Sequence, residues 1–191
     1  MTKTAQILAT VGFAAMAAAS ANATIYVYTA NMDGISEAPP NASPGIGFTT
    51  ITMDDVLNTM RVEATFSGLL GTTTAAHIHA ATAVAGTGTA GVATQTPSFS
   101  GFPLGVSSGS MDTTFDMTLA SSYNASFITA NGGTPLSAFA ALRNALNNGK
   151  AYFNIHSSVF GGGEIRGFPV PTPGVMALVG LAGLVATRRR R

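Results

Sequence analysis

The sequence predicts an all-β protein, an antiparallel β-sandwich that carries one short amphipathic helix at about 135–148. Three features predict this fold. Apolar and polar residues alternate in several short segments, as they do in strands with one buried face. Clusters of Gly, Pro, Asn and Asp, which are typical of turns, separate these segments. Only one segment shows helical spacing instead, and this combination favours a sandwich over a mixed fold.

The strand prediction rests on four segments. Segments 24–30 (TIYVYTA) and 47–53 (GFTTITM) are rich in β-branched and aromatic residues. Segment 60–66 alternates strictly, and its expected inner face consists of Met60, Val62, Ala64 and Phe66. Segment 114–119 repeats the pattern, with an expected inner face of Phe115, Met117 and Leu119. Residues 80–112 are rich in Gly, Thr and Ser, and we expect them to form a long loop with short strand pieces.

The helix prediction rests on its two ends and its apolar spacing. Thr134 suits the N-cap and Pro135 the first helical position, whereas Gly149 suits the position just after the last turn. Between these ends, apolar side chains recur at helical spacing at Leu136, Phe139, Leu142 and Leu146. We expect this helix to lie against one end of the sheet.

Residues 1–23 have the layout of a secretory signal peptide. Lys3 supplies a positive start, an Ala-rich apolar stretch follows, and Ala21-Asn22-Ala23 has the pattern of a cleavage site. We therefore expect export from the cytoplasm and a mature chain that starts at Thr24. A single domain then spans residues 24–169, which is long enough to bury a proper core.

Residues 170–191 are expected to form a sorting signal. VPTPG leads into a short apolar run and then into four arginines, and the run is shorter than the ~20 residues that span a bilayer comfortably. This tail resembles the PEP-CTERM signals of bacteria, with Thr172 where the name-giving motif has Glu. The resemblance implies transient membrane insertion through the C-terminal helix and removal of the tail by an exosortase-type enzyme. It also implies a final location at the cell surface or in the extracellular matrix.

The charge and the composition of the central domain exclude several classes of protein. Only four of the nine Lys and Arg residues lie between residues 24 and 169, whereas all eight Asp and Glu residues do, so this part carries a net charge of −4. Without a basic patch, nucleic-acid binding is not expected. The chain has no cysteine, which excludes disulfides and thiolate metal sites.

The three histidines of the chain, His77, His79 and His156, lie in two short segments, AHIHA and FNIHS. Because side chains two positions apart share one face of a strand, His77 and His79 point the same way while Ile78 points to the core. Asn154 and His156 share a face by the same rule. If these strands are neighbours, three imidazoles converge, and this ligand set suits zinc or copper.

Glu164, on the following strand, is a further candidate, either as a fourth ligand or as an acceptor for the N–H of a ligating imidazole. A structural interpretation stands beside this one. His and Asn side chains on neighbouring strands also fix strand register by hydrogen bonding, and Glu164 and Arg166 sit together on one strand after a glycine turn at 161–163. The pattern alone leaves both interpretations open.

No set of catalytic residues stands out in the sequence. Ser157 follows His156 directly, so on a strand the two side chains point to opposite faces. The glycines before Glu164 precede a strand rather than a helix, which argues against a phosphate-binding loop. The two-metal site of copper–zinc superoxide dismutases needs more histidines than the three present.

The histidine segments resemble the CHRD domain, the repeated module of the developmental regulator chordin, which also occurs in secreted bacterial proteins. The family pattern corresponds to residues 76–79 (AHIH), 153–157 (FNIHS) and 161–167 (GGGEIRG). Its motif positions outside the histidines are Asn154, Gly162, Gly163, Glu164, Arg166 and Gly167. The departures from the pattern are Ala80, Gly161 and Phe168. The resemblance implies an immunoglobulin-like or superoxide-dismutase-like sandwich and no established catalytic residues.

These observations lead to one expected function and one alternative. We expect an exported, non-catalytic binding or structural protein of the cell surface or matrix, with exopolysaccharide or other matrix proteins as partners. The alternative is a copper- or zinc-dependent metalloprotein, a single-metal oxidoreductase or hydrolase, that uses the three histidines.

Overall fold

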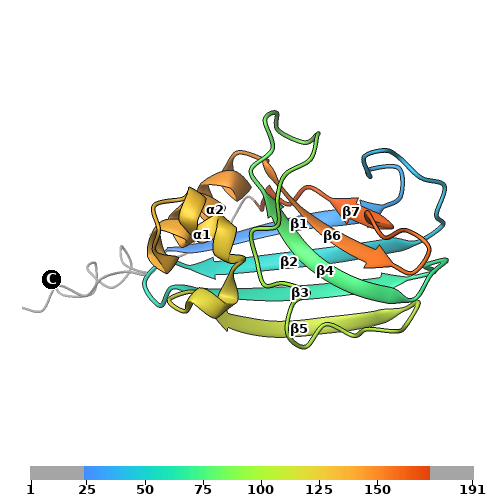
Figure 1. The fold of residues 1–191 in the computed structure, drawn as a ribbon, viewed down its shortest axis with the longest axis horizontal. Helices are drawn as coiled ribbons and strands as arrows, with labels where there is room; N and C mark the ends of the chain where they lie inside the picture. The colour runs from blue at the N-terminus through green and yellow to red at the C-terminus, as the bar shows by residue number, and fades with distance from the viewer. Residues whose placement is uncertain (1–23, 173–191) are drawn as a thin grey trace, which may run out of the picture.

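The computed structural model describes residues 24–172. These residues form one eight-stranded antiparallel sheet with short helices (Figure 1). The strand order is β4-β6-β7-β1-β2-β3-β5, with β8 paired to β1. The strands are β1 (Ile25–Asp33), β2 (Ile46–Asp54), β3 (Thr59–Ser67), β4 (Thr73–Ala80), β5 (Gly109–Asp116), β6 (Ala151–Ser157), β7 (Ile165–Gly167) and β8 (Val170–Pro171). The helices are a 3-10 turn (Ala120–Ser122), α1 (Ala125–Ala130) and α2 (Pro135–Asn147).

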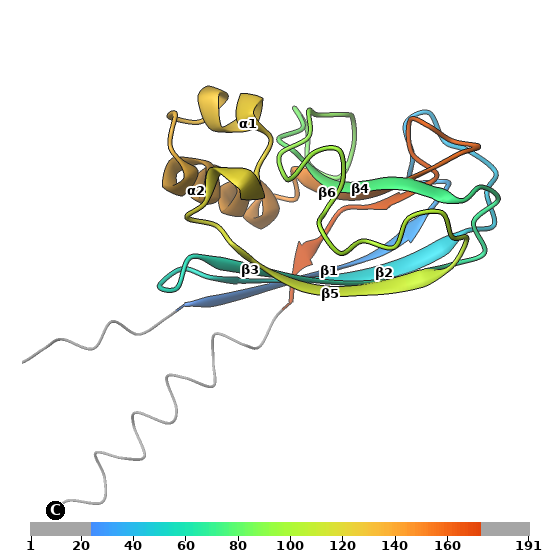
Figure 2. The same cartoon turned by 60° about the horizontal axis from the view of Figure 1, so that its bottom comes forward.

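The sheet bends over itself into two layers. Figure 2 shows β1, β2, β3 and β5 as one layer, with β4 and β6 lying over it. The short strand β7 pairs with β6 on one side and with β1 on the other, so it joins the layers along one edge. The result is a half-barrel, and the predicted all-β antiparallel sandwich is confirmed in this form.

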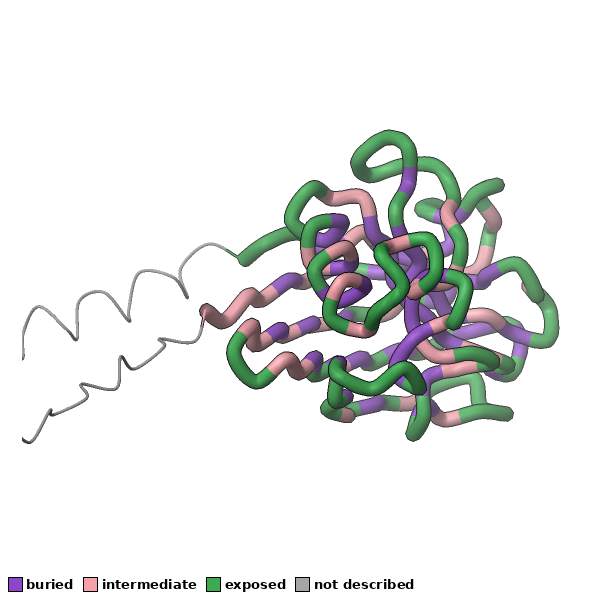
Figure 3. Tube along the Cα trace, turned by 60° about the vertical axis from the view of Figure 1, so that its left-hand side comes forward, coloured by how far each residue is buried: buried purple, intermediate pink, exposed green. Residues whose placement is uncertain are grey.

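Alternating side chains from both layers fill the space between them. Along β3 the predicted inner face of Met60, Val62, Ala64 and Phe66 is buried, and Figure 3 shows the same alternation on neighbouring strands. On β5 the prediction holds for Phe115 and Met117, which are also buried. It is wrong for Leu119, which is 51% exposed, because β5 ends at Asp116 and the chain then turns into the 3-10 helix.

The long connection between β4 and β5 covers the open side of the half-barrel. As predicted, it is irregular, with only isolated bridges to His79 and Tyr123. It is nevertheless part of the core, because the ring of Phe99 lies 5.2 Å from that of Phe115 and 5.8 Å from that of Phe153. This packing holds the loop along the free edge of β4, where the N–H groups of Phe99 and Ala93 donate to the carbonyl oxygens of Ala76 and Ile78.

The predicted helix is confirmed as α2, which lies with α1 at one end of the sandwich (Figures 1 and 2). Thr134 is its N-cap, and Thr134 and Ser137 form a reciprocal capping box that satisfies two backbone N–H groups. Gly149 follows the helix with a φ of 64°. Leu136 is exposed, so it does not belong to the buried face of the helix. The 3-10 turn and α1 were not predicted.

The predicted targeting segments lie mostly outside the described residues. This is true of the signal peptide at 1–23 and of the apolar run and arginines after residue 172. Val170 and Pro171, the first residues of the predicted tail, pair with β1 as β8. Within residues 24–172, no helix is long and apolar enough to cross a membrane.

Candidate metal centre

The two histidine segments form neighbouring strands, as the convergence of three imidazoles requires. β4 pairs with β6 in antiparallel register, with His77 opposite Asn154 and His79 opposite Tyr152. The intervening Ile78 is fully buried in the core on the other face. The histidines therefore lie on the outer face of the β4–β6 layer, where irregular segments cover them and leave His77 and His79 less than a tenth exposed.

Each imidazole is anchored through one nitrogen to a backbone carbonyl. Nε2 of His77 lies 2.6 Å from the carbonyl oxygen of Pro97, Nδ1 of His79 lies 2.9 Å from that of Ala90, and Nδ1 of His156 lies 2.9 Å from that of Gly161. Within residues 24–172, these three carbonyls are the backbone acceptors that the rings contact. A carbonyl oxygen can only accept, so the ring nitrogen in each pair carries the hydrogen. The contacts therefore fix the tautomer of all three rings.

The remaining nitrogen of each ring is then a free lone pair, and the three rings lie close together, with centroids 5.2 to 6.0 Å apart. Candidate ligand atoms of His77, His79 and His156 all lie within 4.8 Å of each other. Nδ1 of His77 is 3.3 Å from Nε2 of His156, and neither nitrogen carries a hydrogen in its fixed tautomer. Nε2 of His79 is buried without any hydrogen-bond partner. Such an arrangement of acceptors is suited to binding a cation.

Burial keeps these rings neutral. Desolvation lowers the pKa of His79 to about 4, with the neighbouring imidazoles and Arg166 lowering it further against the opposing hydrogen bond to Ala90. Desolvation also lowers the pKa of His77 and of His156, although their carbonyl anchors act the other way. At neutral pH the lone pairs are therefore free to bind a metal rather than a proton.

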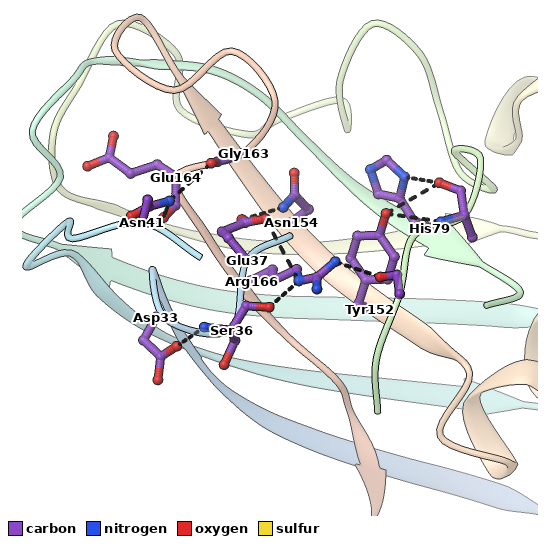
Figure 4. Close-up of polar contacts among 12 residues, drawn as sticks. Asp33, Ser36, Glu37, Asn41, His79, Tyr152, Asn154, Gly163, Glu164 and Arg166 are labelled. Atoms are coloured by element: carbon purple, nitrogen blue, oxygen red, sulfur yellow. Dashed lines mark hydrogen bonds and ion pairs between the residues drawn. The ribbon is translucent and has the colours of Figure 1, made fainter. Parts of the chain in front are cut away.

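Aromatic and cationic side chains extend the cluster across the layer. The ring of Tyr152 stacks on that of His79, with centroids 4.6 Å apart and planes 5° apart. The guanidinium of Arg166 lies 4.8 Å from the centroid of the Tyr152 ring. Figure 4 shows these three side chains in a row. The Tyr152 hydroxyl and Nδ1 of His79 both contact the carbonyl oxygen of Ala90. This row orients the His79 ring.

A buried polar network borders the histidines. Nδ2 of Asn154 donates to Oε1 of Glu37 at 2.6 Å, and Nε of Arg166 lies 3.8 Å from the other carboxylate oxygen. Arg166 also donates to the carbonyls of Ser36 and Gly88, which ties two loops to β7. Desolvation raises the pKa of Glu37 to about 7, against the opposing effects of Arg166 and of hydrogen bonds.

Glu164 lies outside the group of potential ligands that the three histidines form, so its position does not support the expected role as a fourth ligand. The cluster of potential ligands among the described residues contains the three histidines alone. The Glu164 carboxylate instead accepts hydrogen bonds from the backbone of Leu70 and Gly71 and from the Ser43 hydroxyl, at 2.5, 3.2 and 2.6 Å. In Figure 4 it points away from Arg166 and His79. It fixes the β3–β4 loop.

The glycines of the last motif segment have different roles. Gly163 has a φ of 133°, and a Cβ there would collide with the Asn154 amide and with Oε1 of Glu37. A Cβ on Gly167 would collide with the carbonyl oxygen of Asn31. A Cβ on Gly162 would meet nothing. Gly163 and Gly167 are therefore required by close packing, whereas Gly162 is not.

Comparison with known protein families identifies the family of this chain. A sequence model of the CHRD domain matches residues 28–168. The chain belongs to the CHRD family. Among curated proteins and among solved structures, none matches the chain significantly.

The match covers the whole half-barrel of this CHRD domain together with both histidine segments. Sequence reasoning missed three parts of the site: the carboxylate of Glu37, the ring of Tyr152, and the loop carbonyls that anchor the imidazoles. Tyr152 had a detectable signal, since it alternates with Asn154 and His156 along one strand. Glu37 had none, because it lies in an irregular segment far from β6 in the sequence.

Glu37 gives the domain a distinct dependence of stability on pH. Its pKa is about 7 in the folded protein against an ordinary 4.5, so ionisation favours the unfolded chain. Protonated Glu37 contributes fully to the free energy of unfolding below pH 4.5. This contribution is lost as the pH rises to 7, and the loss amounts to about 3 kcal/mol. We expect the difference in unfolding free energy between wild type and Glu37→Gln to fall by this amount across that range.

Chemical denaturation at a series of pH values measures this difference. The histidines titrate in both proteins, so their opposite trend, a loss of stability as the pH falls, cancels in the comparison. Parallel stability curves for wild type and Glu37→Gln would contradict the raised pKa of this carboxyl.

Proposed function

We propose that this protein is an exported, non-catalytic CHRD binding module that holds one copper or zinc ion between His77, His79 and His156. The observation that carries the proposal is the set of three backbone anchors. Each anchor binds the N–H of one imidazole and leaves the other nitrogen as a lone pair inside the cluster. Metal-bound histidines characteristically donate their second nitrogen in this way.

The spacing of the nitrogens supports a single ion. Nitrogens bound to zinc at about 2.0–2.1 Å in tetrahedral geometry lie about 3.4 Å apart. The pair from His77 and His156 is already at 3.3 Å. A candidate nitrogen of His79 lies within 4.8 Å of the other two ligand atoms, and Nε2 of this ring is buried without a hydrogen-bond partner.

The donor set favours particular metals. Three imidazoles without a carboxylate suit zinc and copper, whereas calcium and magnesium require oxygen ligands. Because the rings are neutral, they do not cancel the charge of the buried ion. The carbonyl oxygens of Pro97, Ala90 and Gly161 stabilise this charge through their hydrogen bonds to the imidazoles. The ion would link β4 and β6 to the loops that cover them and stiffen the module.

The cellular location of the protein is part of the same proposal and rests on the sequence patterns of its two terminal segments. The secretory pattern of residues 1–23 and the PEP-CTERM-like tail support export and sorting to the cell surface or matrix by an exosortase-type enzyme. The low charge of the domain and its membership of a family of binding domains support partners such as exopolysaccharide or matrix proteins.

Metal binding is tested with purified, metal-free protein. One equivalent of Zn²⁺ or Cu²⁺ is expected to bind and to raise the free energy of unfolding, by about 2.7 kcal/mol when the free metal is at 100 times the dissociation constant. Calorimetric titration and thermal unfolding measure the two effects. His79→Phe retains a ring to stack on Tyr152 but offers no lone pair, so we expect its affinity to fall at least about 100-fold.

Glu164→Gln is the matched control, because it alters a buried motif residue outside the cluster. This variant is expected to lose stability but to bind the metal with the affinity of the wild type. Equal metal binding by wild type and His79→Phe would contradict the site. Loss of metal in Glu164→Gln alone would move the site to that carboxylate.

The location is tested by recovering the protein from the producing bacterium. Mass spectrometry of the surface and matrix fractions is expected to find chains that begin at Thr24 and lack Arg188 to Arg191. Replacing these four arginines with Ser is expected to reduce the processed form at the surface, whereas replacing the exposed Arg61 is not. Recovery of the intact chain from the cytoplasm would contradict export.

A further inference from the structure

Two buried side-chain atoms within residues 24–172 have no hydrogen-bond partner, and they lie in the same region. One is Nε2 of His79 and the other is Oδ1 of Asn154. Leaving a buried polar atom without a partner costs about 1–3 kcal/mol, so each requires an explanation. A metal ion explains the first atom, which is a lone-pair nitrogen. It does not explain the second, because Oδ1 of Asn154 does not belong to the group of candidate ligand atoms, which comes from the three imidazoles.

Strand register places Asn154 beside the cluster. It is the direct cross-strand partner of His77, and His156 follows it two positions along the same strand. Side chains in these positions share a face, and direct cross-strand pairs have Cβ atoms about 4.5–5.5 Å apart. Asn154 therefore stands next to two of the three imidazoles on the outer face of the layer.

The orientation of the Asn154 amide is fixed from the opposite side. Its Nδ2 donates to Oε1 of Glu37 at 2.6 Å, and Figure 4 shows its oxygen turned away from that carboxylate. Arg166 holds the Glu37 carboxylate in place at 3.8 Å. Gly163 packs closely against both side chains, because a Cβ at this position would lie 2.5 Å from Nδ2 of Asn154 and 2.7 Å from Oε1 of Glu37. The oxygen is thus held ready as an acceptor with no donor from the protein.

We infer that the bound ion keeps a fourth ligand, a water molecule that donates a hydrogen bond to Oδ1 of Asn154, and that a small monodentate anion can replace this water. The inference rests on the proposed metal site. A metal-bound water satisfies both unpartnered atoms at once, since the ion takes Nε2 of His79 and the water takes the amide oxygen. Asn154 is a positioning residue in this arrangement, and Glu37 acts through it.

The charge of the surroundings favours an anion as the replacing ligand. Imidazole ligands carry no charge when they bind a metal, and within residues 24–172 the cluster of potential ligands contains no carboxylate, so a divalent ion keeps its charge. The cationic Arg166 lies close to the same row of rings, over Tyr152. The class of ligand is therefore a small anion with one donor atom, for which azide is the probe.

The test uses the copper-loaded protein at pH 8, where Glu37 is ionised and can only accept. Electron paramagnetic resonance first reports whether copper is bound by imidazole nitrogens. Electron–nuclear double resonance in H₂O and D₂O then detects an exchangeable proton on a copper ligand. Optical titration gives the azide affinity from the azide-to-copper charge-transfer band. We expect an exchangeable proton and saturable azide binding in the wild type.

Asn154→Leu preserves the approximate volume of the side chain but removes the acceptor. Replacing an ordered water with azide loses its hydrogen bond to Asn154 only in the wild type. One hydrogen bond of ordinary strength corresponds to about a fivefold change in affinity, so azide is expected to bind about fivefold more tightly to the variant. Asn31→Leu, on an exposed position of β1, is the matched control and is expected to leave the azide affinity unchanged.

The outcomes separate the two proposals. Failure of copper to acquire nitrogen ligands would contradict the metal site itself. Copper with imidazole ligands but with neither an exchangeable proton nor azide binding would overturn the inference and leave the metal site standing. An unchanged azide affinity in copper-loaded Asn154→Leu would overturn the role of Asn154. If this variant does not fold, the proton coupling and azide binding of the wild type decide the question.

Discussion

The need to satisfy polar side chains on the covered outer face of β4 and β6 governs the rest of this structure. Three histidines and Asn154 occupy that face, and irregular segments bury most of it. Backbone carbonyls from those segments accept one hydrogen from each imidazole and so fix the ring tautomers. Aromatic packing by Phe99 holds the longest of these segments in position. Loop placement, tautomer and site geometry therefore depend on one another.

Electrostatics then divides the face into two parts. Around the histidines, desolvation favours neutral rings, and the group of potential ligands in the described part of the chain contains no acidic side chain. Around Glu37, a buried carboxyl is paired with Arg166 and Asn154. The carboxylate of Glu164 is directed to the β3–β4 loop, where backbone N–H groups and Ser43 use its lone pairs. The cluster is left as a set of neutral donors, which suits a metal ion better than an acid–base role.

The sequence predicts those parts of the structure that depend on local periodicity. Alternation along a strand is sufficient to place His77 and His79 on one face with Ile78 opposite, and capping residues are sufficient to place α2 at Pro135–Asn147. The partners of Glu164 and Glu37 depend instead on where loops far apart in the sequence come to lie. Gly163, with its φ of 133°, immediately precedes Glu164 and changes the backbone direction there, so alternation does not predict the position of that side chain. The carbonyl anchors leave no sequence signal, because every residue has a carbonyl group.

The most direct test of this account is the tautomer of each histidine in the metal-free protein, measured by long-range ¹⁵N–¹H correlation NMR. The account predicts neutral rings at neutral pH, with the hydrogen on Nε2 of His77 and on Nδ1 of both His79 and His156. Addition of Zn²⁺ should then shift only the unprotonated nitrogen of each ring strongly. A hydrogen on Nε2 of His79, or a proton shared between His77 and His156 at neutral pH, would contradict it.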